Sequence, residues 1–298
     1  MIQIKRDNLD SIAQNHYENL KGLVNRRLKN KTGPLFTFIK DNITEILIGK
    51  PQILVDKIIN EIPYNPCCKE EIERIFNYKE FTDQRRTYHA YHLANGLRVN
   101  VCPYCNRQYT FTILEKGTNK GQTRPEFDHF FLQSQYPYLA LSFYNLIPSC
   151  KICNSTFKHD KAWNLSDYIH PYIEGFGNCK FSLKPKQGQG VSFFYGKSDA
   201  FDIYFKNKTS KTCNNINDLK LENIYNEHKD YVSEIIQKAN VYSDSYINQL
   251  FMQYEGTLFS SIGDVRKMVM GNYITDEDID KRVLSKLSKD ISEELGLA

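Results

Sequence analysis

The sequence predicts an α+β protein built from three consecutive regions. Apolar residues recur at helical spacing within residues 1–98 and again beyond residue 218, which favours helices at both ends of the chain. Between them, residues 99–172 contain two Cys-x-x-Cys pairs and short β-rich runs, a combination typical of a compact unit held by a metal ion. We therefore expect a helical region at 1–98, a metal-held core at 99–172, and a β-hairpin followed by helices at 173–298.

Two stretches carry the helical pattern of the first region. Residues 52–62 and residues 81–97 each repeat large apolar or aromatic side chains three and four positions apart. No Gly-Pro break or polar tract separates this region from the core that follows. The residues that define the two patterns are Ile53, Leu54, Ile58, Ile59 and Ile62, and then Tyr88, Tyr91 and Leu93.

The third region combines a strand pattern with helices. Aromatic runs at 193–195 and 201–205 flank a short stretch with Gly196, which predicts a β-hairpin. Beyond it, Leu221, Ile224, Tyr231 and Ile235 fall on one helical face. Thr275 and Asp278 have the spacing of a capping box, so we expect them to open the last helix.

Composition excludes several classes of protein. Of 298 residues, 41% are hydrophobic and 25% are charged, which excludes a disordered or fibrous chain. The mean hydropathy is −0.54, and no apolar run approaches the roughly 18 residues that a spanning helix needs, so we expect no membrane segment. The N-terminus shows no signal-peptide pattern, and a cytosolic location is expected. A net charge of +4 permits nucleic acid as a partner without requiring it.

The spacing of four cysteines is the strongest chemical signal. Cys102 and Cys105 form one pair, Cys150 and Cys153 form the other, and 44 residues separate them. A two-residue gap lets both thiolates of a pair reach one ion, so the two pairs predict a closed, structural zinc site. Two alternatives are an iron–sulfur site, which also uses four thiolates, and buried cysteines that only pack.

A second pattern lies between and after the cysteine pairs. Asp128 and His129 are adjacent, Asn145 follows His129 by 16 residues, and Asn154, directly after Cys153, follows by 9 more. With Lys158 and the flanking cysteines, this order resembles the HNH (ββα-metal) nucleases over about 60 residues. The string from residue 128 to residue 154 is similar to a bacterial anti-phage branch that includes the Septu nuclease subunit. The resemblance implies a zinc-stabilised ββα-metal unit at the centre of the chain.

The chemistry of these residues fits phosphodiester hydrolysis. Histidine has a pKa near 6.5, so His129 is a suitable general base for activating water at neutral pH. Successive strand residues face opposite ways, so we expect Asp128 to bind a metal while His129 addresses the water. Asn154, where many relatives have histidine, would be the second ligand, and this oxygen pair favours Mg²⁺ or Mn²⁺.

Two further residues have expected supporting roles. By resemblance to the family, Asn145 holds the loop that orients the base. Lys158 follows Asn154 by four residues, so it shares a helix face with it and could meet a phosphate oxygen.

Each residue also has a plainer interpretation. Asp128 and His129 could simply end a strand, Asn145 could cap a turn, and Lys158 could be a solvated lysine. His170 has no assignable role and is expected to be a core or turn histidine. Arg85 and Arg86, with His89 and His92 on the same expected helical stretch, could grip a nucleic-acid backbone, although a solvated face is the plainer interpretation.

The sequence therefore predicts a Mg²⁺-dependent HNH endonuclease, acting on DNA in preference to RNA, in a bacterial anti-phage defence system. Its relatives imply an ABC or SMC-like ATPase as a partner protein. One alternative is a zinc-knuckle module that binds nucleic acid without cleaving it. Others are a nuclease that cuts tRNA or other RNA only inside a complex, and an adaptor that does not touch nucleic acid.

Overall fold

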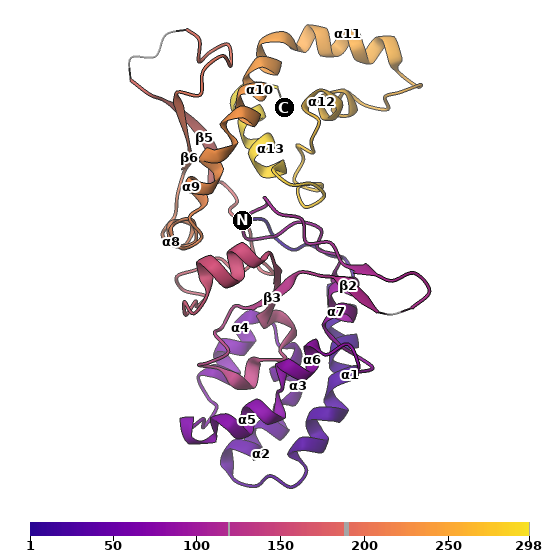
Figure 1. Cartoon of the computed structure of the whole chain (residues 1–298), viewed down its shortest axis with the longest axis vertical. Coiled ribbons are helices and arrows are strands. Elements are labelled where there is room, and N and C mark those ends of the chain that lie inside the picture. The colour runs from indigo at the N-terminus through magenta and orange to yellow at the C-terminus, as the bar shows by residue number, and fades with distance from the viewer. Residues whose placement is uncertain (119, 188–190, 298) are drawn as a thin grey trace. The chain divides into compact units, whose positions relative to one another are not determined.

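The computed structural model describes residues 1–118, 120–187 and 191–297 of the chain. It has an α+β fold with short two-stranded sheets, so the expected class is confirmed. The chain divides into two compact units (Figure 1). The N-terminal unit comprises 3–104 and 110–175, and the C-terminal unit comprises 1–2, 105–109 and 176–298. The ranges predicted as separate, 1–98 and 99–172, thus lie almost wholly in one unit.

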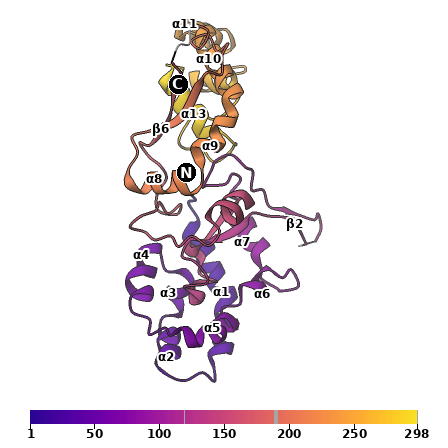
Figure 2. The same ribbon diagram turned by 60° about the vertical axis from the view of Figure 1, so that its left-hand side comes forward.

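Helices make up the first part of the N-terminal unit. Helix α1 packs against α3 and α7, and these neighbours can be followed in Figures 1 and 2. Their buried faces carry apolar residues at helical spacing, such as Leu20, Val24 and Leu28 on α1. The helices are α1 (Leu9–Leu28), α2 (Pro34–Asp41), α3 (Ile43–Ile48), α4 (Pro51–Ile53), η1 (Leu54–Ile59), η2 (Pro66–Cys68), α5 (Lys69–Ile75), α6 (Tyr78–Thr82) and α7 (Ala90–Leu97).

The prediction of a single helix over residues 81–97 is wrong. Two helices, α6 and α7, occupy this range, and a turn at 83–89 separates them. The Asp83 carboxylate accepts hydrogen bonds from the backbone N–H and guanidinium of Arg85, which stabilises the turn instead of a continued helix. Arg85 and Arg86 therefore lie in a turn rather than on a helical stretch with His92.

Two small sheets complete the N-terminal unit. Strands β1 (Ile113–Leu114) and β2 (Gly121–Thr123) form one antiparallel pair. Strands β3 (Glu126–His129) and β4 (Leu146–Ser149) form the other, in which Asp128 pairs with Ile147 and His129 with Leu146. The short helices η3 (Pro137–Leu139) and η4 (Phe143–Asn145) lie in the connection from β3 to β4, and the π-helical η5 (Ile152–Lys158) follows β4. The order strand, strand, helix thus covers the motif from Asp128 to Lys158.

The C-terminal unit packs helices against one hairpin-like sheet. Strands β5 (Lys180–Pro185) and β6 (Phe201–Lys206) are antiparallel, and α13 contacts β5. Phe181 lies at the centre, with its ring 4.1 Å from that of Phe205 and 4.3 Å from that of Tyr225. The helices are α8 (Ser210–Asp218), α9 (Leu221–Tyr225), η6 (Asn226–His228), α10 (Lys229–Val241), α11 (Asp244–Tyr254), α12 (Ile262–Met270) and α13 (Ser285–Glu294).

Two expectations for this region are wrong. The partner of 201–206 is β5, not 193–195, because Gly196 has φ +63° and turns the chain before a second strand can form. Phe194 and Tyr195 are consequently exposed. The last helix begins at Ser285, and Thr275 and Asp278 lie in a turn instead.

Candidate metal centre and catalytic motif

The four predicted cysteine ligands lie together. The Sγ atoms of Cys102, Cys105, Cys150 and Cys153 are all within 4.8 Å of one another, and the residues are almost fully buried. Four sulfurs about 2.3 Å from a tetrahedral ion lie roughly 3.8 Å apart, so the cluster can hold an ion such as zinc. The predicted four-cysteine cluster is therefore confirmed as a candidate metal site.

Backbone N–H groups support the sulfur atoms as they do in metal knuckles. Cys150 N donates to Cys102 Sγ at 3.3 Å, and Cys153 N donates to Cys150 Sγ at 3.4 Å. Arg107 N donates to Cys105 Sγ at 3.4 Å. Such donors stabilise thiolate charge and fix the direction of each sulfur lone pair. After Cys105, the left-handed Asn106 (φ +51°) turns the chain back.

The Asp128 carboxylate is buried and has two partners. Its side chain is 3% exposed, Tyr104 donates its hydroxyl to Oδ2 at 2.5 Å, and Lys158 Nζ lies 3.0 Å from Oδ1. Burial, and then the neighbouring Asp128 charge, raise the pKa of Tyr104 well above its ordinary value, so its hydroxyl remains a donor. Because Tyr104 lies within the first cysteine pair, this hydrogen bond connects that knuckle directly to the predicted catalytic motif.

Lys158 does not point to solvent. The side chain is 0% exposed, and besides Asp128 it donates to the backbone oxygen of His129 at 2.8 Å. The expected phosphate contact is therefore not available in this arrangement. The reason is that helical spacing places Lys158 and Asn154 on one face of η5, and that face packs on β3 instead of facing a ligand.

His129 lies at the end of β3 on the opposite face from Asp128, as strand alternation requires. Its Nε2 is 3.0 Å from the Ala140 carbonyl oxygen, and its ring centroid is 4.6 Å from that of Tyr78. A carbonyl can only accept, so Nε2 carries the proton and Nδ1 keeps its lone pair. Among the described residues, none donates to Nδ1. Burial is the main cause that lowers the pKa of His129.

Asn145 is fully buried and bonds only to backbone. Its Oδ1 accepts from Phe131 N at 2.7 Å, and its Nδ2 donates to the oxygens of Phe131 and Leu139, both at 3.1 Å. These bonds hold the segment that runs from β3 to Ala140, whose carbonyl accepts from His129. Asn145 thus holds this loop by hydrogen bonds, and its role in orienting a general base stays a prediction.

Asn154 is not directed at Asp128. Its Nδ2 donates to Glu126 Oε2 at 2.9 Å, and Ser155 donates to the same oxygen at 2.7 Å. Glu126 and Asp128 share a face of β3, so η5 meets this face through two polar pairs, Asn154 with Glu126 and Lys158 with Asp128. Within the described residues, no hydrogen bond joins Asp128 to Asn154. The two expected Mg²⁺ ligands therefore do not form a cation site in this arrangement, in which a lysine ammonium already neutralises the carboxylate.

Sequence reasoning missed His16 as well as Glu126. His16 is fully buried on α1, where Nε2 bonds to Leu141 O at 2.8 Å and Nδ1 bonds to the Tyr88 hydroxyl at 3.0 Å. Three consecutive carbonyls, from Leu139 to Leu141, therefore accept bonds from Asn145, His129 and His16 in turn. The available signal was a polar residue four positions from Ile12 and Leu20 on the apolar stripe of α1.

His170 is a core histidine, in line with the plainer expectation. Its ring centroid lies 4.2 Å from that of Phe130, and Nδ1 accepts from Tyr172 N at 3.3 Å. Burial lowers the pKa of His170 to about 3. The imidazole is thus neutral at physiological pH and contributes packing.

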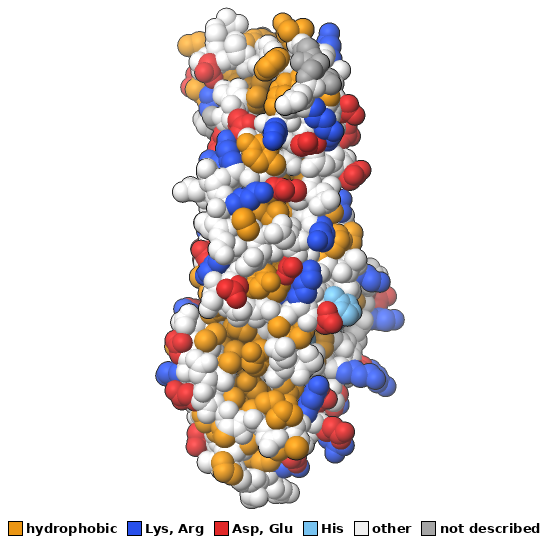
Figure 3. Space-filling model, turned by 90° about the vertical axis from the view of Figure 1, so that its left-hand side faces the viewer, with side chains coloured by type: hydrophobic (Ala, Val, Ile, Leu, Met, Phe, Trp, Pro, Cys, Tyr) orange, Lys and Arg blue, Asp and Glu red, His pale blue; other side chains and the backbone are white. Residues whose placement is uncertain are grey.

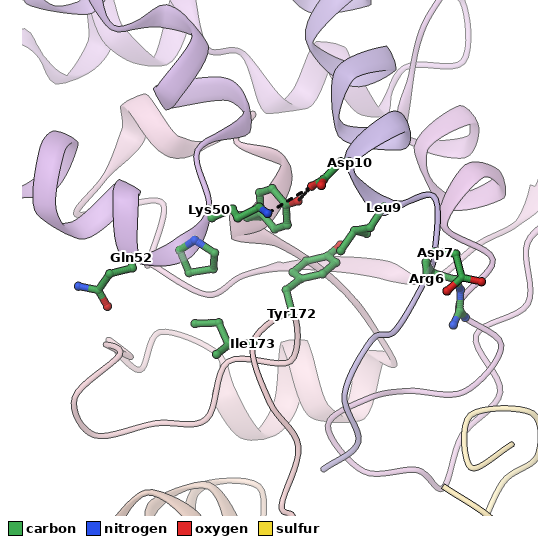
Figure 4. Close-up of a pocket in the computed structure, with 10 residues that line it drawn as sticks. Arg6, Asp7, Leu9, Asp10, Lys50, Gln52, Tyr172 and Ile173 are labelled. Carbon is green, nitrogen blue, oxygen red and sulfur yellow. Dashed lines mark hydrogen bonds and ion pairs between the residues drawn. The ribbon is translucent and has the colours of Figure 1, made fainter. Parts of the chain in front are cut away.

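A hollow of about 540 Å³ lies beside the motif in the same unit (Figure 4). Tyr172 crosses it, and the Tyr172 hydroxyl donates to Leu146 O on β4. Asp10 accepts from the Tyr144 hydroxyl at 3.0 Å and lies 3.6 Å from Lys50. Figure 3 shows hydrophobic side chains grouped on one face of the N-terminal unit. None of the predicted catalytic residues lines this hollow, so we assign it no part in the site.

Comparisons with known proteins leave the family open. No family model matches the chain, and no solved structure matches it. The chain is similar to Protein ea31 of Escherichia phage lambda, with 24% identity over 226 residues. The matched segment is 72% of this chain and 65% of that protein, so the chain spans less than two thirds of the relative's length. Within the described part of the chain, no helix is both long enough and apolar enough to cross a membrane.

Proposed function

We propose that the chain is an HNH-type endonuclease that hydrolyses phosphodiester bonds of nucleic acid, with DNA as the preferred substrate. The observation that carries the proposal is the state of His129. Its Nε2 proton is committed to a carbonyl, and its Nδ1 lone pair has no described donor, so the ring is prepared to accept a proton. The strand, strand, helix order of β3, β4 and η5 and the adjoining cysteine cluster support the same assignment.

The proposed reaction is attack of water on the phosphorus atom. His129 takes one proton from the water through Nδ1, the new oxygen–phosphorus bond forms, and the bond to the 3′ oxygen breaks, with the leaving 3′ oxygen taking a proton from solvent water. By resemblance to the HNH nucleases, the products carry a 5′-phosphate and a 3′-hydroxyl. Asn145 keeps the Ala140 carbonyl in place and is therefore a positioning residue for His129.

The sequence also predicts a catalytic Mg²⁺ or Mn²⁺, but the side chains expected to hold this ion are already paired with protein groups. The Asp128 carboxylate accepts from the Tyr104 hydroxyl and pairs with the Lys158 ammonium, and the Asn154 amide donates to Glu126. These residues do not fit a divalent cation as they are arranged, and the steps above do not pass through one. Metal dependence therefore needs its own arm in the assay.

A cleavage assay tests the proposal. Purified protein is incubated with supercoiled plasmid and with tRNA, with Mg²⁺, with Mn²⁺ and without an added divalent cation. We expect nicking or linearisation of the plasmid that is lost in His129→Ala and kept in His159→Ala, because His159 is an exposed histidine 30 residues further on. Cleavage that persists undiminished in His129→Ala would remove the mechanism.

One observation favours a second candidate, a zinc-knuckle module that binds nucleic acid without cleaving it. Lys158 occupies the Asp128 carboxylate in a fully buried ion pair, which withholds that carboxylate from chemistry. The module predicts salt-dependent binding with no cleavage of any substrate, including when a partner protein is present. Assays with the products of neighbouring genes test three further parts of the proposal. These are a defence role, an ABC or SMC-like ATPase as a partner, and RNA cleavage that occurs only inside a complex.

A further inference from the structure

A hollow of about 900 Å³ lies between the turn that follows α6 and Lys120, directly before β2, within the N-terminal unit. Its lining includes Arg85, Arg86, His89, His92 and Lys120, and we call it the cationic hollow. The mechanism proposed above uses none of these side chains.

The two walls of the cationic hollow are fixed to each other. Gly121 N donates to Gln84 Oε1 at 2.9 Å, and Gln84 Nε2 donates back to Gly121 O at 3.2 Å. A Cβ at Gly121 would lie 2.1 Å from the Tyr91 ring, so this close approach requires glycine. Lys120 is therefore held opposite the turn that carries Arg85.

The lining is rich in positive charge and in N–H donors. Three side-chain cations line the cationic hollow; Arg85 pairs with Asp83 and Arg86 pairs with Glu80 of α6, so these five groups together carry a net charge of +1. His92 Nδ1 accepts from His89 N at 3.3 Å, so the neutral His92 ring carries its proton on Nε2 as a further donor. Such a set suits the oxygens of a phosphate group.

His89 is a buried side chain in the wall of the cationic hollow. Its side chain is 2% exposed, it lines the cationic hollow, and its Nδ1 has no hydrogen-bond partner within the described part of the chain. Burial is the first cause that lowers the pKa of His89, and the neighbouring His92 and Arg124 lower it further.

Helix α6 relates the cationic hollow to the motif. Tyr78 at its first residue packs edge-on against His129, and Thr82 at its last residue lines the hollow. At 1.5 Å of rise per residue, the two ends of α6 are about 6 Å apart. His129 and the cationic hollow therefore lie at opposite ends of one short helix.

We infer that the cationic hollow binds a backbone phosphate of the nucleic acid next to the bond presented to His129. The inference rests on the proposed function for its substrate class. The chemistry recognised is a phosphate oxyanion, which a free phosphate ion also offers, and the experiment separates these two sources.

The test measures binding of labelled duplex and single-stranded oligonucleotides to the full chain by fluorescence anisotropy, across a salt series and without added divalent cation. Arg85→Ala and Lys120→Ala should each raise Kd about fivefold, equally for unrelated sequences, and reduce the salt slope by about 1. Arg85→Lys should keep the slope. Arg74→Ala is the matched control, because Arg74 is an exposed arginine paired with an acidic residue in the same unit but away from the cationic hollow.

Three results would overturn the inference. They are wild-type protein that shows no salt-dependent binding, variants with unchanged Kd and slope, and inorganic phosphate that binds alone while oligonucleotide affinity does not change. The cleavage assay is independent of these readouts. If Lys120→Ala weakens binding but the wild type cleaves no substrate, phosphate binding in the cationic hollow is supported and the nuclease proposal is rejected. If cleavage depends on His129 but binding is unchanged in the variants, the nuclease proposal is supported and phosphate binding in the cationic hollow is rejected.

Discussion

Lys158 Nζ lies 3.0 Å from Asp128 Oδ1, and the two side chains are 0% and 3% exposed. The ammonium also contacts the backbone oxygen of His129 and lies 5.2 Å from the centre of the Trp163 ring. This pair fixes η5 to β3 and determines whether the Asp128 carboxylate is available. A buried ion pair is costly to break, because the partner left behind is charged and has no water around it.

Lys158→Met should therefore lower the free energy of unfolding by about 3–5 kcal/mol. The double variant Asp128→Asn/Lys158→Met should recover much of the loss, because it removes both charges while the introduced amide oxygen can still accept from Tyr104. Urea denaturation followed by circular dichroism measures both values, and Lys116→Met, at an exposed lysine, is the control. A double variant no more stable than the single variant would contradict the buried-pair account.

Metal content tests the cysteine cluster. We expect about one zinc ion per chain, and Cys153→Ser should lose most of it and lower the melting temperature, because the free energy of metal binding contributes to folding. Cys213→Ser is the matched control, since Cys213 lies outside the cluster. Elemental analysis and thermal denaturation give the two readouts. Native protein with neither zinc nor iron would contradict the site.

The sequence was sufficient for the cysteine cluster because ligand spacing is local. Each Cys-x-x-Cys pair brings its own two sulfurs together, and in the fold the two pairs meet, with Cys150 N donating to Cys102 Sγ. Strand alternation likewise correctly separated Asp128 from His129. These features depend on a few neighbouring residues and on backbone geometry.

The partners of Asp128 and Asn154 could not be predicted in the same way. Helical spacing gives the direction of Lys158 around η5, but it does not say whether β3 or a ligand lies on that side. Glu126 lies two residues before Asp128 on the same strand face, so its carboxylate accepts the hydrogen bond from the Asn154 amide. This contact depends on how η5 packs on β3, which the sequence spacing does not specify. The error at 191–206 has a similar cause, since an aromatic run does not specify its partner strand.

The stability of the fold should depend on the side-chain amide of Asn145. Asn145→Asp would place a carboxylate oxygen against the carbonyls of Phe131 and Leu139 in a fully buried position, and Asn145→Ala would leave backbone groups without partners. We expect a loss of about 3 kcal/mol for alanine and a larger loss for aspartate. Asn19→Ala, at an exposed asparagine, is the control for unfolding by urea. Equal stability of Asn145→Ala and wild type would show that the loop does not depend on this side chain.

His16 predicts a pH dependence of stability. Burial lowers the pKa of His16 from 6.5 to about 4 in the folded protein, whereas the unfolded chain keeps the ordinary value. Between these values the unfolded state binds more protons, so stability is complete above pH 6.5 and is lost as the pH falls toward 4. The contribution is on the order of 3 kcal/mol, at 1.36 kcal/mol for each pKa unit.

His16→Gln isolates this contribution, because glutamine can still donate to the Leu141 carbonyl but does not titrate. The difference in unfolding free energy between wild type and His16→Gln should fall steadily from pH 7 to pH 4 and then level off. His170 and the cysteine cluster also respond to acid, but they respond in both proteins and cancel in the difference. His159→Gln, at an exposed histidine, should show no such slope. A difference that is constant across this range would mean that burial does not hold His16 neutral in the folded protein. The hydrogen bond from His16 to the Leu141 carbonyl, beside His129, would then not depend on burial.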